Sequence, residues 1–156
     1  MEWLKSLGPS FLVLIGAIVT WLLKSKSEEL QSIREKLRED QRLIYRKLLD
    51  PFIRLIAESK GEDSGIARQQ LLSYDFRKTY VEFNLAGSDN VIRAYNKFMQ
   101  HGYKFNKTKN GKEFMRLLGT LLLEIRKSLG NKKTDLNKYD MLEGIIIDIE
   151  DLKKNI

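Results

Sequence analysis

The sequence predicts an all-α protein in which one N-terminal transmembrane helix precedes a cytoplasmic antiparallel bundle of about four to five helices. Only two prolines and ten glycines interrupt its 156 residues, a composition that favours helices over sheets. Beyond residue 27, apolar residues recur every three or four positions, which is the spacing of amphipathic helices. We therefore expect an anchor over residues 1–24 and a helical domain over residues 25–156, in which residues 25–43 are interpreted as a juxtamembrane stalk or short coiled coil.

The anchor prediction depends on residues 7–23, a run of seventeen residues without a charged side chain. At about 1.5 Å per residue, such a helix is at the short end of what crosses a hydrocarbon core of about 30 Å. A cleaved signal peptide and a buried core helix are the alternatives, but no small-x-small cleavage site follows the run and the run is apolar on every face. The residues expected to span the membrane include Leu7, Phe11, Leu14, Ile15, Val19 and Leu23.

Charged residues on the two sides of this run predict its orientation. Lys5 is the only basic side chain before the run, whereas six Lys or Arg residues occur in the twenty residues after it. Because positive charge accumulates on the cytoplasmic side, we expect the N-terminus outside the cell inner membrane and the rest of the chain in the cytoplasm. Gly8, Gly16 and Thr20 share one helix face, which either lets a second helix approach closely or reflects the ordinary composition of membrane helices.

The first predicted helix after the anchor covers residues 27–59 and begins with Ser27 as its N-cap. Pro51 lacks a backbone N–H, so this helix is expected to bend or break near residues 47–50. The elements that follow are a loop over residues 60–65 and a second helix over residues 66–85.

Three further helices are predicted from caps and from glycines that stop a helix. Their expected bounds are Ser88 to residue 100 with Gly102 just beyond the end, residues 112–129 with Gly130 beyond the end, and residues 138–152 with Asn137 as the cap. A polar, basic loop should connect the first two of these. In the expected packing, Ile145, Ile146 and Ile149 of the last helix contact Leu118, Leu121, Leu122 and Ile125 of the helix before it.

The residue types exclude several kinds of chemistry. The chain has no cysteine and a single histidine, His101, so disulfides, thiolate metal sites and cysteine nucleophiles are excluded. We infer no cofactor, no metal site, no small-molecule substrate and no catalytic residue. The net charge is +7, and the candidate basic surface consists of Lys104, Lys107, Lys109, Lys112, Lys132 and Lys133. These lysines are interpreted as solvated loops or as a surface for lipid headgroups or a protein partner, in preference to a nucleic-acid site.

Two motifs carry a resemblance to known proteins. They are AGSDNVIRAYNKF, residues 86–98, and LLLEIRKSLGNKKTDLNKYDML, residues 121–142. They resemble a family of uncharacterised bacterial helical proteins that are often anchored in the membrane. The matching positions are residues 86–96 and 125–130 with Thr134, Leu136, Asp140 and Leu142. The resemblance covers the cytoplasmic half to two thirds of the chain; it implies a helical bundle and membrane attachment, and it transfers no activity.

Two functions fit these features. The first is a non-enzymatic interaction module that binds a protein partner or a second copy of itself at the inner membrane surface. The alternative is a membrane-perturbing effector, similar to toxin-like or defence proteins, that acts by oligomerisation of its transmembrane helix. In both cases the expected partners are the lipid bilayer and either a homo-oligomer or another protein.

Overall fold

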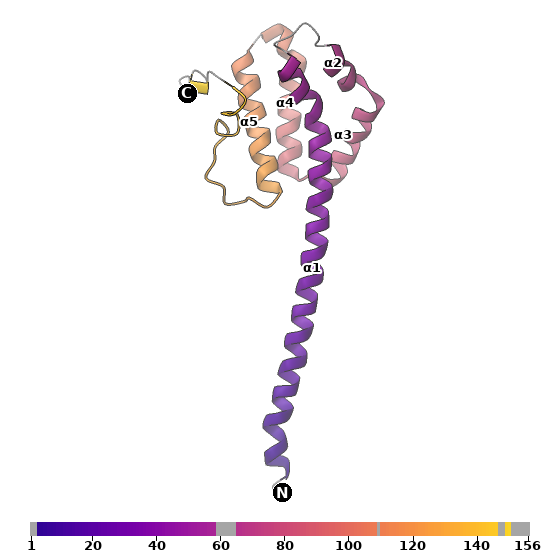
Figure 1. Ribbon diagram of the computed structural model, residues 1–156, viewed down its shortest axis with the longest axis vertical. Helices are drawn as coiled ribbons and strands as arrows, with labels where there is room; N and C mark the ends of the chain where they lie inside the picture. Colours follow the sequence, from indigo (N-terminus) through magenta and orange to yellow (C-terminus); the bar gives the residue numbers. More distant parts are fainter. Residues whose placement is uncertain (1–2, 59–64, 109, 147–148, 151–156) are drawn as a thin grey trace. The chain divides into compact units, whose positions relative to one another are not determined.

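The computed structural model describes residues 3–58, 65–108, 110–146 and 149–150, with side chains for residues 14–57, 65–104, 110–146 and 149–150. The regular secondary structure in this part of the chain is entirely helical, which confirms the all-α class. They are α1 (Trp3–Glu58), α2 (Gly65–Leu72), α3 (Tyr74–Ala86), α4 (Asp89–Thr108) and α5 (Gly111–Ser128), as Figure 1 shows. The chain divides into two units, residues 1–39 and residues 40–156.

The first unit contains the N-terminal part of α1, which runs without interruption through the position of the predicted cap at Ser27. The prediction of a helix start at Ser27 was therefore wrong. The flanking Lys and Glu residues are good helix formers, and Lys24 pairs with Glu28 one turn later, with 4.0 Å between Nζ and Oε1. Within the described residues, no helix combines the length and the apolar character that crossing a membrane requires. The side chains of Leu7 and Phe11, and the surroundings of Gly8, lie outside the part of the chain whose side chains the structure describes.

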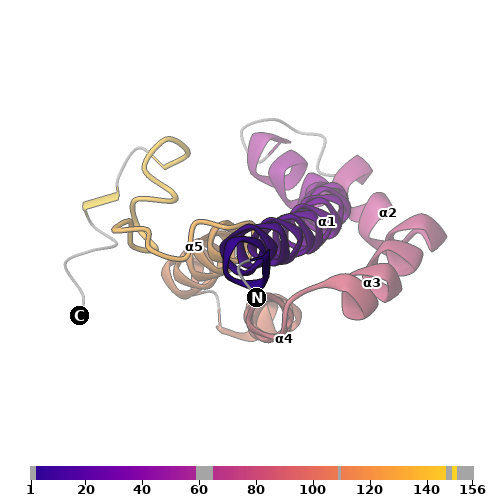
Figure 2. The ribbon, with the colours of Figure 1, turned by 90° about the horizontal axis from the view of Figure 1, so that it is seen from below.

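Pro51 lies in the second unit, and α1 continues through it to Glu58. Figure 2 shows the last turns of α1 pointing in a different direction from the turns before them, which agrees with the predicted bend. Pro51 and Leu48 are fully buried, and Phe52 is nearly so. Burial on both sides of the proline explains why the helix bends there and does not end.

The second predicted helix is in fact two helices, α2 and α3, that meet at Ser73. The Ser73 hydroxyl accepts a hydrogen bond from the backbone N–H of Phe76 at 3.1 Å and donates one to the carbonyl of Gln70 at 2.7 Å. It therefore satisfies the first turn of α3 while it bonds back to α2. A serine that competes for backbone groups in this way interrupts a helix whose apolar pattern is continuous.

The predicted end of a helix at Gly102 was also wrong, because α4 continues to Thr108. Gly102 lies beside α5, where a Cβ atom would come within 3.8 Å of the Phe114 ring. Packing against α5 outweighs the cost of a glycine in a helix, which is about 1 kcal/mol. The predicted loop over residues 103–112 is accordingly much shorter, and Asn110 caps α5 by accepting a hydrogen bond from the Glu113 N–H at 3.1 Å.

The end of α5 agrees with the prediction. Gly130 has a positive φ of 116°, a conformation that glycine adopts without strain. Its N–H donates to the carbonyl of Lys127, and the N–H of Asn131 donates to the carbonyl of Arg126. These two bonds form a Schellman motif, the usual way in which a glycine ends a helix.

The predicted fifth helix is absent from residues 138–145, which form consecutive turns. Asn137 has the expected capping geometry, since its Oδ1 accepts from the N–H of Tyr139 at 2.8 Å and of Asp140 at 3.3 Å. Two of the four backbone bonds that follow are one residue shorter than those of an α-helix, as between the Leu142 N–H and the Tyr139 carbonyl at 2.9 Å, so no continuous helical ladder forms. Gly144 and the β-branched isoleucines that follow it disfavour a helix.

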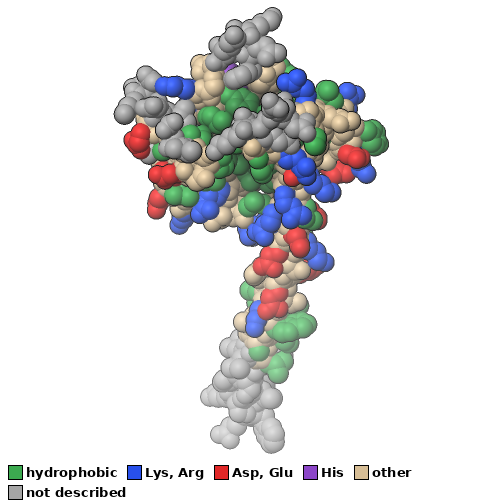
Figure 3. All heavy atoms as spheres, turned by 45° about the horizontal axis from the view of Figure 1, so that its top comes forward, with side chains coloured by type: hydrophobic (Ala, Val, Ile, Leu, Met, Phe, Trp, Pro, Cys, Tyr) green, Lys and Arg blue, Asp and Glu red, His purple; other side chains and the backbone are tan. Residues whose placement is uncertain are grey.

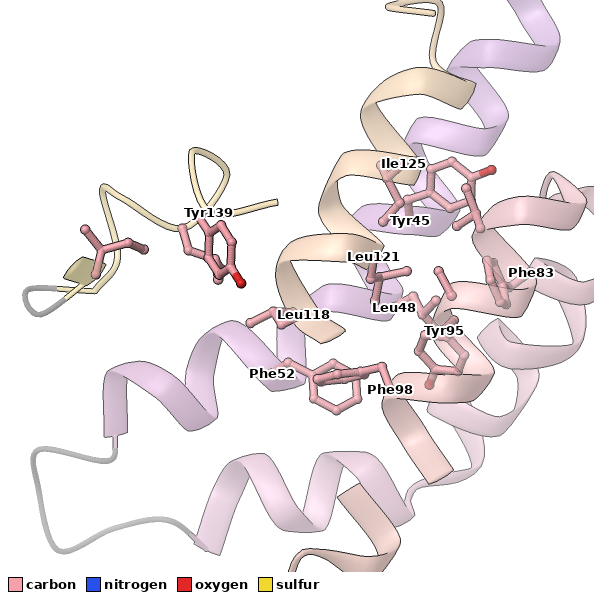
Figure 4. Close-up of a cluster of buried hydrophobic side chains, with 14 residues drawn as sticks. Tyr45, Leu48, Phe52, Phe83, Tyr95, Phe98, Leu118, Leu121, Ile125 and Tyr139 are labelled. Carbon is pink, nitrogen blue, oxygen red and sulfur yellow. The ribbon is translucent and has the colours of Figure 1, made fainter. Parts of the chain in front are cut away.

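The core of the second unit is built on aromatic rings from α1, α3 and α4. Figure 4 shows Phe52, Tyr95 and Phe98 close together. The ring centre of Phe52 is 5.0 Å from that of Phe98 and 6.4 Å from that of Tyr95, both nearly edge-on. Helix α5 packs beside α4 and buries the predicted core residues Leu118, Leu121 and Ile125.

The turn segment after α5 also reaches the core, although it is not helical. Leu142 is fully buried, whereas Ile145 is 49% exposed, and Ile149, which lies beyond the turns, is nearly buried. Ile146 packs against the core at its edge. The sequence therefore predicted correctly that this segment covers α5, and it was wrong about the role of Ile145, because the turns do not have the helical period on which that assignment depended.

Candidate functional site

The first unit carries apolar side chains that nothing in the described chain covers. All residues from 14 to 39 are exposed. Leu23, Leu30 and Leu37 are spaced by seven residues and are 67%, 54% and 51% exposed. Ile33 lies on the same face, at the d position of the heptad whose a positions are the three leucines. We call these four residues the heptad stripe.

Charged side chains border the heptad stripe. Figure 3 shows that side chains of both signs share the surface of α1 with apolar ones. Glu28 pairs with Lys24, and Glu35 accepts a hydrogen bond from Gln31 at 3.0 Å. Glu29 and Arg34 have no ion-pair partner among the described residues. They occupy a g position and the following e position, which face each other between the two chains of a parallel coiled coil.

The predicted anchor residues whose side chains are described are all exposed. They are Leu14, Ile15, Val19 and Leu23, with exposed fractions between 43% and 67%. A Cβ atom on Gly16 would meet nothing within 4 Å. The Thr20 hydroxyl donates to the Gly16 carbonyl at 2.8 Å, so its hydrogen-bonding need is met within the helix. This face of α1 is therefore open to the close approach of another helix.

The predicted basic residues do not gather in one place. Lys104 lies on α4 and Lys112 in the first turn of α5, whereas Lys132 and Lys133 follow the other end of α5. Because α5 has 18 residues and a helix rises about 1.5 Å per residue, the two groups are separated by roughly 27 Å. Lys109 and the side chain of Lys107 lie outside the described residues. The four described lysines are all exposed and form two separate groups.

A polar cavity of about 840 Å³ lies among α1, α2 and α3. At its wall the Asp50 carboxylate accepts hydrogen bonds from the side chains of Gln70 and Arg54, each at 3.0 Å. These bonds hold the pKa of Asp50 below its ordinary value. No three potential metal ligands of the His, Cys, Asp and Glu types cluster in the described residues. The cavity thus contains a polar link between α1 and α2.

Two buried tyrosines differ in how their hydroxyl groups are satisfied. Tyr45 Oη accepts hydrogen bonds from the Ser88 N–H at 3.2 Å and the Ser128 hydroxyl at 3.4 Å. Tyr95 Oη is buried and has no hydrogen-bond partner among the described residues. Burial, and then the nearby Tyr103 and Tyr80, raise the pKa of Tyr95. The side chains are otherwise alike, since both are 2% exposed or less and both rings meet Phe83 edge-on.

This difference predicts opposite effects for the same substitution. Tyr45→Phe should lower the free energy of unfolding by about 1 to 3 kcal/mol, because it leaves the Ser88 N–H without its partner. Tyr95→Phe should leave stability unchanged or raise it, because it removes a hydroxyl that is already unsatisfied. Thermal unfolding of the full chain, followed by circular dichroism, measures both. Equal destabilisation by the two substitutions would contradict the hydrogen bonding described above.

No protein-family model, curated protein or solved structure matches the chain. The resemblance carried by residues 86–98 and 121–142 therefore stays a prediction. In the structure those residues include the start of α4, the Schellman motif after α5 and the turn segment. The continuation of the heptad stripe to Leu23 was not predicted, although the seven-residue spacing of Leu23, Leu30 and Leu37 is visible in the sequence. The flanking pair of Glu29 and Arg34 follows once the heptad positions are assigned.

Proposed function

We propose that this protein is a non-enzymatic module, held at the inner membrane surface by residues 1–24, that associates with a second copy of itself through the heptad stripe. The observation that carries the proposal is the exposure of Leu23, Leu30 and Leu37 on one face of α1. The membrane attachment is supported by the uncharged run of residues 7–23 and by the positive charges that follow it.

The geometry of an anchored pair favours a parallel arrangement. Two copies that enter one membrane in the same orientation have parallel helices, so the heptad stripes face each other in register. Glu29 of each copy then lies opposite Arg34 of the other. Lys26 and Asp40 occupy the remaining d positions and weaken the seam, since like charges face each other there. The association is therefore expected to depend on the anchor, which raises the effective concentration of the two helices.

Cysteine cross-linking tests this arrangement, because the chain has no cysteine of its own. In membranes, Leu30→Cys and Leu37→Cys should each form a disulfide-linked dimer on mild oxidation. Ser32→Cys is the matched control: residue 32 is also exposed but lies on the opposite side of the helix. With Leu37→Cys as the reporter, Glu29→Arg or Arg34→Glu should slow cross-linking several-fold, and the double exchange should restore it, since each exposed pair contributes up to about 1 kcal/mol.

Equal cross-linking at positions 30 and 32 would contradict a defined seam. A cross-linked product that contains another protein, with no dimer, would show that the stripe binds a different partner. Loss of cross-linking in the double exchange as well as in the single ones would contradict the parallel pairing of Glu29 with Arg34.

The open Gly16 face favours the second candidate function, a membrane-perturbing effector. A Cβ atom there would meet nothing within 4 Å, so a neighbouring helix has room to approach. Depolarisation of the inner membrane on expression of the full chain, but not of a chain that lacks residues 1–26, would support the effector. Cross-linking through Leu30→Cys without depolarisation would support the interaction module.

A further inference from the structure

Two adjacent cavities lie on the α4 side of the aromatic core, in the second unit. The larger has a volume of about 540 Å³ and is lined mainly by apolar side chains from α1, α2, α4 and α5, among them Phe52, Phe98, Phe114 and Met115. The smaller has a volume of about 280 Å³ and lies between α4 and the α2 to α3 region. Leu71, Met99 and Tyr103 line both cavities and form the border between them. A volume of several hundred Å³ with mainly apolar walls is typical of a small-molecule site.

The smaller cavity is bordered by a residue whose hydroxyl group has no partner among the described residues. Tyr95 is one of its lining residues; the side chain is 1% exposed, and its Oη has no hydrogen-bond partner among the described residues. Buried polar groups in folded proteins nearly always have a partner. Because burial raises the pKa of Tyr95, the phenol keeps its proton at neutral pH and offers a hydrogen-bond donor. An acceptor atom from a ligand in the cavity would complete this bond.

Two arginines define the charge of that ligand. Arg68 lines the larger cavity and Arg77 lines the smaller one. Neither forms an ion pair with another described residue. The site thus combines an apolar chamber, a neutral donor and two exposed positive charges, while Met99 and Met115 have the flexible side chains that adapt to an alkyl chain.

We infer that these cavities bind a single-chain anionic amphiphile, such as a fatty acid, with its alkyl chain among the phenylalanines and methionines and its acidic head accepting a hydrogen bond from Tyr95. Arg77 lines the same cavity as Tyr95, so its positive charge favours an anionic head there. This site is independent of the heptad stripe, which lies in the other unit.

Photolabelling of the full chain in phosphatidylcholine vesicles tests the site. The probe is dodecanoic acid with a diazirine near the far end of the chain, followed by irradiation, digestion with trypsin and mass spectrometry. Cleavage after Lys97 and Lys104 yields peptide 98–104, which contains the cavity residues Phe98, Met99, Gly102 and Tyr103. Cleavage after Lys5 and Lys24 yields peptide 6–24, which serves as the internal reference for contact of an apolar segment with free probe.

We expect label in peptide 98–104 that dodecanoate displaces and dodecyltrimethylammonium does not. Tyr95→Phe should reduce this labelling roughly tenfold relative to wild type, the effect of losing one hydrogen bond to a charged acceptor. Tyr45→Phe is the matched control, because its ring is as buried but lines neither cavity; its labelling should stay at the wild-type level.

Three results would overturn the inference. Label confined to peptide 6–24 would mean that the cavities do not take the probe. Undiminished labelling of Tyr95→Phe would mean that the hydroxyl holds only an ordered water molecule. Equal displacement by dodecyltrimethylammonium would exclude recognition of an anionic head. Label in peptide 98–104 without label in peptide 6–24 would support the site and count against the proposed anchor, so the two proposals fail separately.

Discussion

Leu142→Ala is expected to lower the free energy of unfolding by about 2 to 5 kcal/mol, the usual cost of removing a buried leucine side chain. Leu142 is fully buried although it lies in turns and not in a helix. Its Cδ1 atom approaches α5 at Gly119. The turn segment is therefore part of the core, and its loss should uncover the outer side of α5. Thermal unfolding of the full chain, with hydrogen exchange of α5 as a local measurement, gives the effect.

Ile145→Ala provides the control for this prediction. Ile145 lies three residues away in the same turns and is 49% exposed, so its truncation should change stability by only about 0.5 kcal/mol. An α-helix over residues 138–152 with Ile145 facing inward would make the two costs similar. Similar costs would therefore contradict the turn conformation and favour the helix that the sequence pattern predicts.

Gly119→Ala is the second substitution for which a large effect is expected. A Cβ atom at Gly119 would clash with the backbone oxygen of Lys138 and would lie 3.1 Å from Cδ1 of Leu142. The oxygen belongs to the main chain and cannot rotate away, so the turn segment must move off α5. We expect a loss of about 3 kcal/mol, at the upper end of the costs of overpacking, and faster hydrogen exchange in residues 137–146.

Gly102→Ala is the matched control, because it makes the same change inside a helix of the same bundle. Its Cβ atom would meet only the Phe114 ring, at an ordinary 3.8 Å. It should therefore stabilise the protein by up to about 1 kcal/mol through the better helix propensity of alanine. If Gly119→Ala also stabilises the protein, the turn segment does not pack on α5 as described.

The parts of the fold that could be predicted are those that depend on neighbouring residues. The positive φ of Gly130 and the Schellman bonds after α5 need only a glycine at the end of an amphipathic run. The burial of Leu118, Leu121 and Ile125 follows from their helical spacing. The bend at Pro51 follows from its missing N–H. In each of these cases the local preference and the tertiary contacts agree.

The two candidate sites, the heptad stripe and the cavities, also differ in whether they can be predicted from the sequence. The heptad stripe can be read from the chain, since a seven-residue spacing places side chains on one face of any continuous helix. The cavities cannot be read in this way, because Leu71, Tyr95 and Phe114 come from three helices. The sequence also contains nothing that distinguishes Tyr95 from Tyr45, since the difference depends on whether Ser88 and Ser128 reach the hydroxyl.

The sequence by itself determined the helical class, the position of the uncharged run, the end of α5 and the spacing of the stripe. Only the tertiary structure decided that α4 continues past Gly102, where the helix packs against α5. The interruption at Ser73 and the turns over residues 138–145 also became apparent only in the structure, although their causes are local. Helix propensities differ by about 1 kcal/mol or less for these residues, whereas burying one leucine or phenylalanine side chain contributes about 1.5 to 3 kcal/mol. Where packing on another element opposes a local preference, the packing therefore prevails.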